Sequence, residues 1–260
     1  MPGDLRAYTC GHTHHDLAQL VSGRSRERRR FPSTVFCYRS GDRVVLFDTG
    51  YAPQPWRTGP AGRLYQRLLP PELPPGQDVA DQLDPAIVTY VVLSHLHPDH
   101  IGGLRHFRHA HLVLHRDQLA TLAGPRLREG LLRGLLPDWF AEATQQTDRC
   151  TAVEQFIPGP AGLGTFDLFG DGSYLLVHLP GHARGHLGAL IEGRVLLAAD
   201  AAWGRDLLEQ VHRMRVVPRW ITYDGAAHRD TARRLLEIER GGVRLLFSHD
   251  DHPSGVNLLA

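Results

Sequence analysis

The residues best suited to chemistry lie in a short histidine-rich segment, residues 94–103, with the sequence SHLHPDHIGG. Four side chains able to bind a metal stand within six of its residues: His95, His97, Asp99 and His100. In an extended chain, residues two apart point the same way, so the imidazoles of His95 and His97 can converge on one ion. Three imidazoles and a carboxylate at this spacing predict a metal site with mixed nitrogen and oxygen ligands.

The residues around these side chains indicate how the segment folds. Pro98 is expected to resist early helix formation, so that a turn brings Asp99 and His100 to the far side of the same pocket. The pair Gly102–Gly103 is expected to permit the tight turn into the next element. The apolar run Ile87–Leu93 predicts a buried strand, and loops beyond strand ends are where rigid scaffolds hold active residues.

Three apolar runs later in the chain are also followed by candidate ligands: His182, Asp200 and His249. The glycines of residues 179–186 allow the backbone to turn close to a site. A carboxylate at the end of the buried run 196–199 is costly unless it is paired or binds a metal.

The segment 94–103 resembles the HxHxDH signature of metallo-β-lactamase-fold hydrolases, and Asp48-Thr49-Gly50 resembles the DTG motif of that family. This resemblance implies the fold class α+β. The architecture would be an αββα sandwich, in which two mixed sheets pack face to face with helices outside and a metal site lies at one edge between them. We expect residues 1–260 to form a single domain with two pseudo-repeated halves, about 1–157 and 165–260.

The resemblance also implies two divalent metal ions. The first would bind His95, His97, His182 and Asp200. The second would bind Asp99, His100, His249 and Asp200, so that Asp200 bridges the pair. His186 is expected to be a structural partner, and Asp48 to accept the far ring N–H of a ligand histidine. Such mixed ligation suits zinc, and it leaves iron, manganese and cobalt open.

A dinuclear centre of this kind implies hydrolysis, in which a hydroxide shared by the metals attacks an ester, lactone, thioester or phosphoester. Asp99 and Asp200 are therefore predicted to be catalytic as well as metal-binding. The sequence contains no Gly-x-Ser-x-Gly elbow to support a serine nucleophile.

The order of the segments and the total length are most similar to N-acyl-homoserine lactonases of the quorum-quenching type. These enzymes commonly carry a tyrosine three residues after the bridging aspartate. Here that position is Trp203, which has an indole N–H but no acidic hydroxyl. Tyr223, before the last predicted helix, is a candidate replacement. The prediction is a hydrolase that opens a lactone or ester. A phosphodiester, organophosphate or thioester hydrolase is the alternative, and a metal-binding or redox iron protein without hydrolytic activity is a third.

The elements that must position these residues follow from hydrophobic patterning. Strands are predicted at 34–38, 44–47, 174–179, 187–191, 195–199 and 243–247. Helices are predicted at 64–69 and 226–238, with two more within 115–133 interrupted at Gly124-Pro125. Loops are predicted at 51–60 and 70–77, and 158–164 is the most linker-like stretch. Residues 1–30 are expected to be irregular, with His12, His14 and His15 at the surface or a pocket rim. The run Arg24–Arg30 is expected to be a solvated loop or, alternatively, a clamp for an acidic substrate group.

Composition limits the partners. The 260 residues carry 29 basic and 28 acidic side chains, a balance of 29 − 28 = +1, which gives no electrostatic basis for binding nucleic acid. No apolar run approaches the ~18 residues of a membrane span. The three cysteines, Cys10, Cys37 and Cys150, are expected to be reduced thiols of a cytoplasmic protein. The expected partner is a small-molecule substrate, and loops 51–60, 70–77 and 125–145 are candidates for a substrate channel or a homodimer contact.

Overall fold

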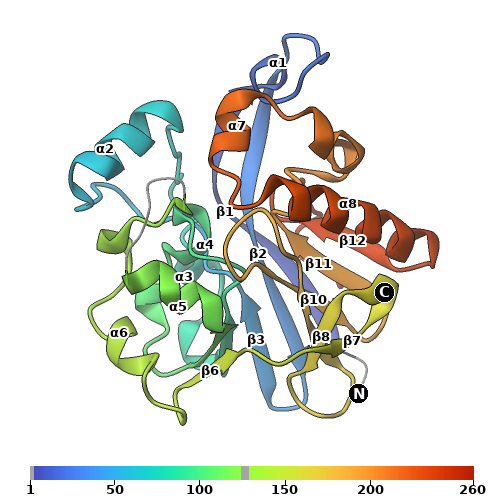
Figure 1. The fold of residues 1–260 in the computed structure, drawn as a ribbon. Helices are drawn as coiled ribbons and strands as arrows, with labels where there is room; N and C mark the ends of the chain where they lie inside the picture. The colour runs from blue at the N-terminus through green and yellow to red at the C-terminus, as the bar shows by residue number, and fades with distance from the viewer. Residues whose placement is uncertain (1–2, 124–128) are drawn as a thin grey trace.

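The computed structural model describes residues 3–123 and 129–260, and these form two six-stranded sheets with helices outside them (Figure 1). The first sheet contains, in spatial order, β1 (Asp4–Asp16), β2 (Arg28–Ser40), β3 (Arg43–Phe47), β4 (Tyr90–Val92), β5 (His111–His115) and β6 (Cys150–Val153). The second contains β12 (Arg244–Phe247), β11 (Val195–Ala199), β10 (Leu187–Ile191), β9 (Tyr174–His178), β8 (Gly164–Asp167) and β7 (Ile157–Pro158). Each sheet mixes parallel and antiparallel pairs, which confirms the predicted α+β class.

Helices cover the outer faces of the sandwich. The α-helices are α1 (Leu17–Leu20), α2 (Gly59–Leu68), α3 (Val79–Gln82), α4 (Pro98–Ile101), α5 (Arg116–Ala123), α6 (Phe140–Ala143), α7 (Val216–Trp220) and α8 (Gly225–Arg240). The 3₁₀ helices among the described residues are η1 (Pro85–Ile87), η2 (Leu104–His106), η4 (Arg133–Leu135), η5 (Pro160–Gly162) and η6 (Arg205–Arg213). In Figure 1, α3, α5 and α6 lie on one side of the strands and α8 lies on the other. No helix within the described residues is both long enough and apolar enough to cross a membrane.

Strands that are buried on both faces separate three layers of core. In β2, Val35 and Cys37 pack toward the helices, whereas the alternate residues Phe36 and Tyr38 pack between the two sheets. β11 does the same, because Leu196 and Ala198 face α8 while its other three residues face the opposite sheet. Side chains alternate across a strand, so a continuous apolar run is what a strand between two layers requires.

Most predicted strands and helices are present, but the strand predicted over Ile87–Leu93 is much shorter than expected. It is replaced at its start by η1, whose N-cap Asp84 accepts a hydrogen bond from the backbone N of Ala86 at 3.0 Å. Only Tyr90–Val92 remains in the ladder, between β3 and β5. The helix predicted at 226–238 is α8, and the proposed break at Gly124-Pro125 lies outside the described residues.

The prediction that residues 1–30 are irregular is wrong. β1 spans 13 residues and pairs along its whole length with β2, which itself begins at Arg28. A register shift between Thr9 and His12, with Gly11 at φ +94°, interrupts the alternation of side chains. A bulge hides the period-two pattern that identifies a strand, and this explains why the polar strand was missed.

The linker-like stretch 158–164 is a turn inside the second sheet. It contains η5 and joins β7 to β8 as an antiparallel pair. The first sheet already ends at Val153, and the second begins at Ile157.

One histidine between the sheets gives a pH prediction. The His178 ring from the second sheet lies 4.7 Å from the His115 ring of the first and stacks on Phe156. Burial, and then the nearby His115, lowers the pKa of His178 to about 4. The ordinary pKa of histidine is ~6.5, so below that pH His178 is protonated in the unfolded chain but still neutral in the folded chain. The free energy of unfolding therefore falls as the pH drops from about 6.5 toward 4.

We therefore expect His178→Phe to lose less stability on acidification than the parent protein. The difference in the free energy of unfolding between pH 7 and pH 5 should be about 2 kcal/mol smaller in the variant. Urea unfolding at both pH values measures it, with exposed His212 as the matched His→Phe control. An unchanged pH dependence would contradict the assignment.

Candidate metal centre

The structure brings all seven sequence-predicted metal ligands to one place. Each follows the carboxyl end of a strand: β4 leads to the 95–100 segment, and β9, β11 and β12 lead to His182, Asp200 and His249. Their potential ligand atoms form two groups in which every atom lies within 4.8 Å of the others. The first group is His95, His97, His182 and Asp200. The second group is Asp99, His100, Asp200 and His249. These are the two sets that the resemblance to metallo-β-lactamase-fold hydrolases implied.

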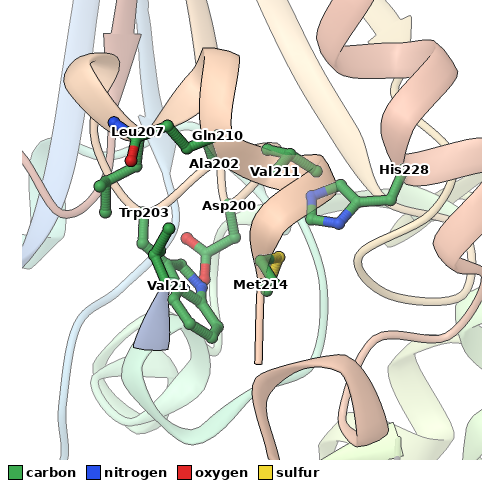
Figure 2. A pocket seen from close by; sticks show the side chains of 9 residues that line it. All are labelled: Val21, Asp200, Ala202, Trp203, Leu207, Gln210, Val211, Met214 and His228. Atoms are coloured by element: carbon green, nitrogen blue, oxygen red, sulfur yellow. The ribbon is translucent and has the colours of Figure 1, made fainter. Parts of the chain in front are cut away.

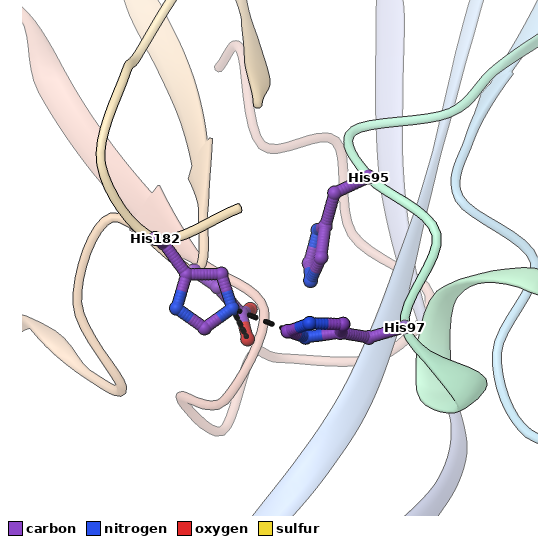
Figure 3. Close-up of side chains that lie close together, drawn as sticks. His95, His97 and His182 are labelled. Carbon is purple, nitrogen blue, oxygen red and sulfur yellow. Dashed lines mark hydrogen bonds and ion pairs between the residues drawn. The ribbon is translucent and has the colours of Figure 1, made fainter. Parts of the chain in front are cut away.

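In the first group, three imidazoles converge from two different loops (Figure 3). The Nδ1 atom of His97 lies 3.2 Å from Nε2 of His182, which lies 3.4 Å from Oδ2 of Asp200. Ligands at about 2.0–2.1 Å around a tetrahedral ion are separated by about 3.3 Å, so these spacings fit one shared cation.

The second group has the same spacing. The Nε2 atom of His249 lies 3.1 Å from Oδ2 of Asp200 and 3.6 Å from Oδ2 of Asp99. The Nε2 atom of His100 lies 3.4 Å from the other oxygen of Asp200. The Asp200 carboxylate therefore stands between the groups, with Oδ2 near His182 and His249 and Oδ1 near His100.

The charges of the site are consistent with bound cations. Three buried carboxylates, those of Asp48, Asp99 and Asp200, have only histidines as ion-pair partners among the described residues. Burial would lower the pKa of His249, but Asp200 and Asp99 raise it to about 9. Buried negative charge of this kind is tolerated only when paired. Divalent ions would supply the charge and displace the proton from that imidazole.

His95 is suited to bind such an ion. Its Nε2 atom is buried and makes no hydrogen bond within the described part of the chain. Burial and the neighbouring His100 and His97 rings lower the pKa of His95 well below its ordinary value. The imidazole is therefore neutral at physiological pH, as a metal ligand must be.

A network behind the centre fixes two of the ligand rings. Asp48 accepts hydrogen bonds from His100 Nδ1 at 2.7 Å, Ser94 Oγ at 2.7 Å and Ser94 N at 2.8 Å. Ser94 Oγ lies 2.9 Å from Nδ1 of His95. The outer nitrogens of both rings are thus occupied, which leaves Nε2 of each for the metal. The contact predicted for Asp48 is confirmed, whereas the role of Ser94 was missed because serine before a histidine is unremarkable in sequence.

We expect Asp48→Asn to reduce metal affinity and activity by about 10–100-fold, the usual effect of losing an outer hydrogen-bond partner. An amide at this position can present its N–H to His100 Nδ1, which also carries N–H. Two donors cannot form a hydrogen bond, so the ring would lose its fixed orientation. Metal titration and kcat/KM measure the effect. Asp42→Asn, in the exposed turn before β3, is the control, and equal affinity in both variants would contradict this role.

Two expectations for the 98–103 turn are corrected. Pro98 does not delay the helix, because it is the first residue of α4, a position that needs no backbone N–H donor. Gly102 and Gly103 have ordinary backbone angles and serve close packing instead. A Cβ on Gly102 would lie 2.0 Å from the backbone N of Ala52, and one on Gly103 would lie 2.3 Å from the carbonyl O of Thr49.

Further backbone contacts hold the later ligands. His249 Nδ1 lies 2.7 Å from the carbonyl O of Pro32. His186 Nδ1 lies 3.0 Å from the carbonyl O of Leu179, and its Nε2 accepts a bond from the backbone N of Asp200 at 3.3 Å. His186 is therefore engaged on both nitrogens, as expected for a structural partner.

A narrow, largely apolar pocket adjoins Asp200 (Figure 2). It is lined by Val21, Asp200, Ala202, Trp203, Leu207, Gln210, Val211, Met214 and His228. The rings of Trp203 and His182 are 6.4 Å apart, so this position lies beside the centre. The backbone N of Tyr223 bonds to the carbonyl O of His182 at 3.0 Å, and the guanidinium of Arg184 lies 5.1 Å from the Tyr223 ring.

A pair of tyrosines near the centre was missed by sequence reasoning. The Tyr51 and Tyr65 hydroxyls lie 3.3 Å apart, and Trp56 packs on both rings. Burial, and also the charge of Asp99, raises the pKa of both hydroxyls well above the ordinary value. Both tyrosines are thus protonated and within electrostatic reach of Asp99. Tyr51 directly follows the DTG motif, which was the available signal.

The arginine run is only partly the solvated loop that was predicted: residues 24–27 lie outside helices and strands, whereas Arg28–Arg30 begin β2, and three of the arginines form ion pairs. Arg24 and Arg29 pair with Asp206, and Arg30 pairs with Asp251 at 2.7 Å.

Comparison with known proteins places these features in a family. A profile described as the metallo-beta-lactamase superfamily matches residues 28–249. The chain is 32% identical over 180 residues to an N-acyl homoserine lactonase AttM of Azorhizobium caulinodans, covering 65% of this chain and 60% of that protein. It is 30% identical over 240 residues to the N-acyl homoserine lactonase AiiB of Agrobacterium fabrum, covering 84% and 79%. An N-acyl homoserine lactone hydrolase, solved with N-hexanoyl-L-homoserine at its metal centre, superimposes with a TM-score of 0.69 at 18% identity, covering 95% of this chain and 93% of that one.

Proposed function

The chain belongs to the metallo-beta-lactamase superfamily, and from that premise we propose that it is a dinuclear metal-dependent hydrolase that opens a lactone or ester similar to an N-acyl-homoserine lactone. The observation that carries the proposal is the pair of buried ligand groups that share Asp200. The lactonase relatives support the substrate class. Each sheet contributes ligands, so neither half holds a complete site, and this supports one domain over residues 1–260.

We propose that His95, His97, His182 and Asp200 hold one zinc ion, and that Asp99, His100, His249 and Asp200 hold the other. When bound, such a pair lowers the pKa of water toward neutrality and polarises a carbonyl. The chain's own residues set this up: Asp48 and Ser94 fix the rings of His100 and His95.

The surroundings favour a neutral substrate with an apolar part over an anionic one. The pocket beside Asp200 has mostly apolar walls and no lysine or arginine among its lining residues, so it offers no cation to an anionic substrate group. Four arginines that could attract an anion already face carboxylates: Arg24, Arg29, Arg30 and Arg184. A phosphodiester, which is anionic, would gain less from cations that are paired in this way.

Trp203 allows a test of substrate placement. We expect Trp203→Tyr to raise lactonase kcat by about 10-fold or more, because a hydroxyl donor beside the centre can stabilise the developing oxyanion. Trp203→Phe, which adds no hydroxyl, is the control. Equal rates in the three proteins would show that position 203 does not face the reacting carbonyl, and would favour Tyr223 or the Tyr51–Tyr65 pair as the hydroxyl source.

The proposed function is tested by metal quantification together with a substrate panel. Purified protein should contain two metal ions per chain and should hydrolyse N-acyl-homoserine lactones faster than aryl esters, thioesters or phosphodiesters. Turnover of phosphodiesters alone would replace the lactonase with the alternative hydrolase. Absence of turnover across acyl chain lengths would refute the lactonase proposal.

A further inference from the structure

A further cluster of possible ligands lies where β1 meets the segment between α2 and α3, outside the dinuclear centre and sharing no residue with it. It consists of His12, His14 and Glu72, whose donor atoms all lie within 4.8 Å of one another. His12 and His14 are two apart on an extended strand, so their rings point the same way, with centroids 5.1 Å apart.

The backbone places the carboxylate opposite these rings. Glu72, between α2 and α3, forms an isolated antiparallel bridge with His12, in which each backbone N bonds to the other's carbonyl O at 2.8 Å. Gly11 makes the approach tight, because a Cβ there would lie 2.9 Å from the Glu72 carbonyl O. The third donor is thus fixed by the main chain and not only by a flexible side chain.

The spacing of the donors matches that of the dinuclear centre. The Glu72 carboxylate lies 3.6 Å from Nε2 of His12 and 3.3 Å from Nδ1 of His14. The side chain of His12 is about nine-tenths buried, and its Nδ1 atom has no hydrogen-bond partner among the described residues. Burial, and then Arg30, lowers the pKa of His12, so this ring is neutral and able to bind a metal.

We propose that His12, His14 and Glu72 form a third metal site, which takes a divalent transition metal such as zinc or copper. Two imidazoles and a carboxylate suit these ions and not calcium or magnesium. Glu72 is about half exposed, so water or a small anion can complete the coordination, and the ion should exchange readily. The inference does not depend on the hydrolase proposal.

Zinc counting tests the site directly. Protein with a filled dinuclear centre, dialysed at micromolar free Zn²⁺, should bind three ions per chain, and His14→Ala and Glu72→Gln should bind two. His109→Ala, at an exposed histidine, should keep three. In the Asp200→Asn background the His14-dependent ion should remain, which separates this site from the dinuclear centre.

Copper provides a second readout. Cu²⁺ added to zinc-filled protein should give an electron paramagnetic resonance spectrum with splitting from two imidazole nitrogens, reduced to one in His14→Ala. The proposal is overturned if the parent protein binds no more zinc than the His14 and Glu72 variants, or if the copper spectrum is the same in both.

Discussion

Replacing Asp200 by asparagine should abolish the dinuclear centre and lower kcat/KM by about 1000-fold or more. Losing only a residue that hydrogen-bonds to a metal ligand already lowers metal affinity or activity by about 10–100-fold, and Asp200 is itself a proposed ligand. One Asp200 oxygen faces His182 and His249 and the other faces His100, so a single change affects both groups. An amide has one oxygen, no negative charge and an N–H₂ group that repels a cation.

Elemental analysis and steady-state kinetics on a lactone measure this effect, and a thermal melt checks that the variant folds. Asp206→Asn is the matched control, since Asp206 lies six residues later and its exposed carboxylate pairs with Arg24 and Arg29. Two metals per chain and a normal rate in Asp200→Asn would show that this carboxylate bridges nothing.

Asp99→Asn should remove only one metal. Asp99 belongs to the second group, in which Oδ2 lies 3.5 Å from Nε2 of His100 and 3.6 Å from that of His249. Burial would raise the pKa of Asp99, but His100 keeps it below its ordinary value, so the residue offers a charged oxygen. We expect about one metal ion in the dinuclear centre and a 100- to 1000-fold lower rate, by analogy with other lost charge-stabilising groups.

Metal content separates this variant from Asp200→Asn. A variant that keeps His95, His97 and His182 intact should still retain the first ion at micromolar free metal. Asp81→Asn, at an exposed carboxylate of α3, is the control. If metal content and rate both survive in Asp99→Asn, the second group is not a working metal site.

The ligands could be identified in sequence because their signals are local. Each follows an apolar strand, and the residues at 95 and 97 obey the two-residue period of extended chain. The strands themselves were predicted because buried runs such as 195–199 are continuously apolar. The same local rules failed for β1, where a bulge at residues 9–12 breaks the pattern.

Other features depend on contacts between residues far apart in the chain. Arg29 pairs with Asp206 across 177 positions, and Arg30 with Asp251 across 221, so a run of like charge became a set of ion pairs. Ser94 contacts Asp48 only because β4 lies beside β3. Nothing near these residues in the sequence records their partners.

The sequence by itself determined the donor types and their positions at strand ends, because strand period and residue type act over a few residues. Only the tertiary structure decided which oxygen of Asp200 faces which imidazole, which cations remain to attract a substrate, and that Glu72 meets His12 and His14. Those outcomes depend on how two sheets pack and on a backbone bridge across 60 residues. Such contacts are selected by the free energy of the whole fold and not by any local preference.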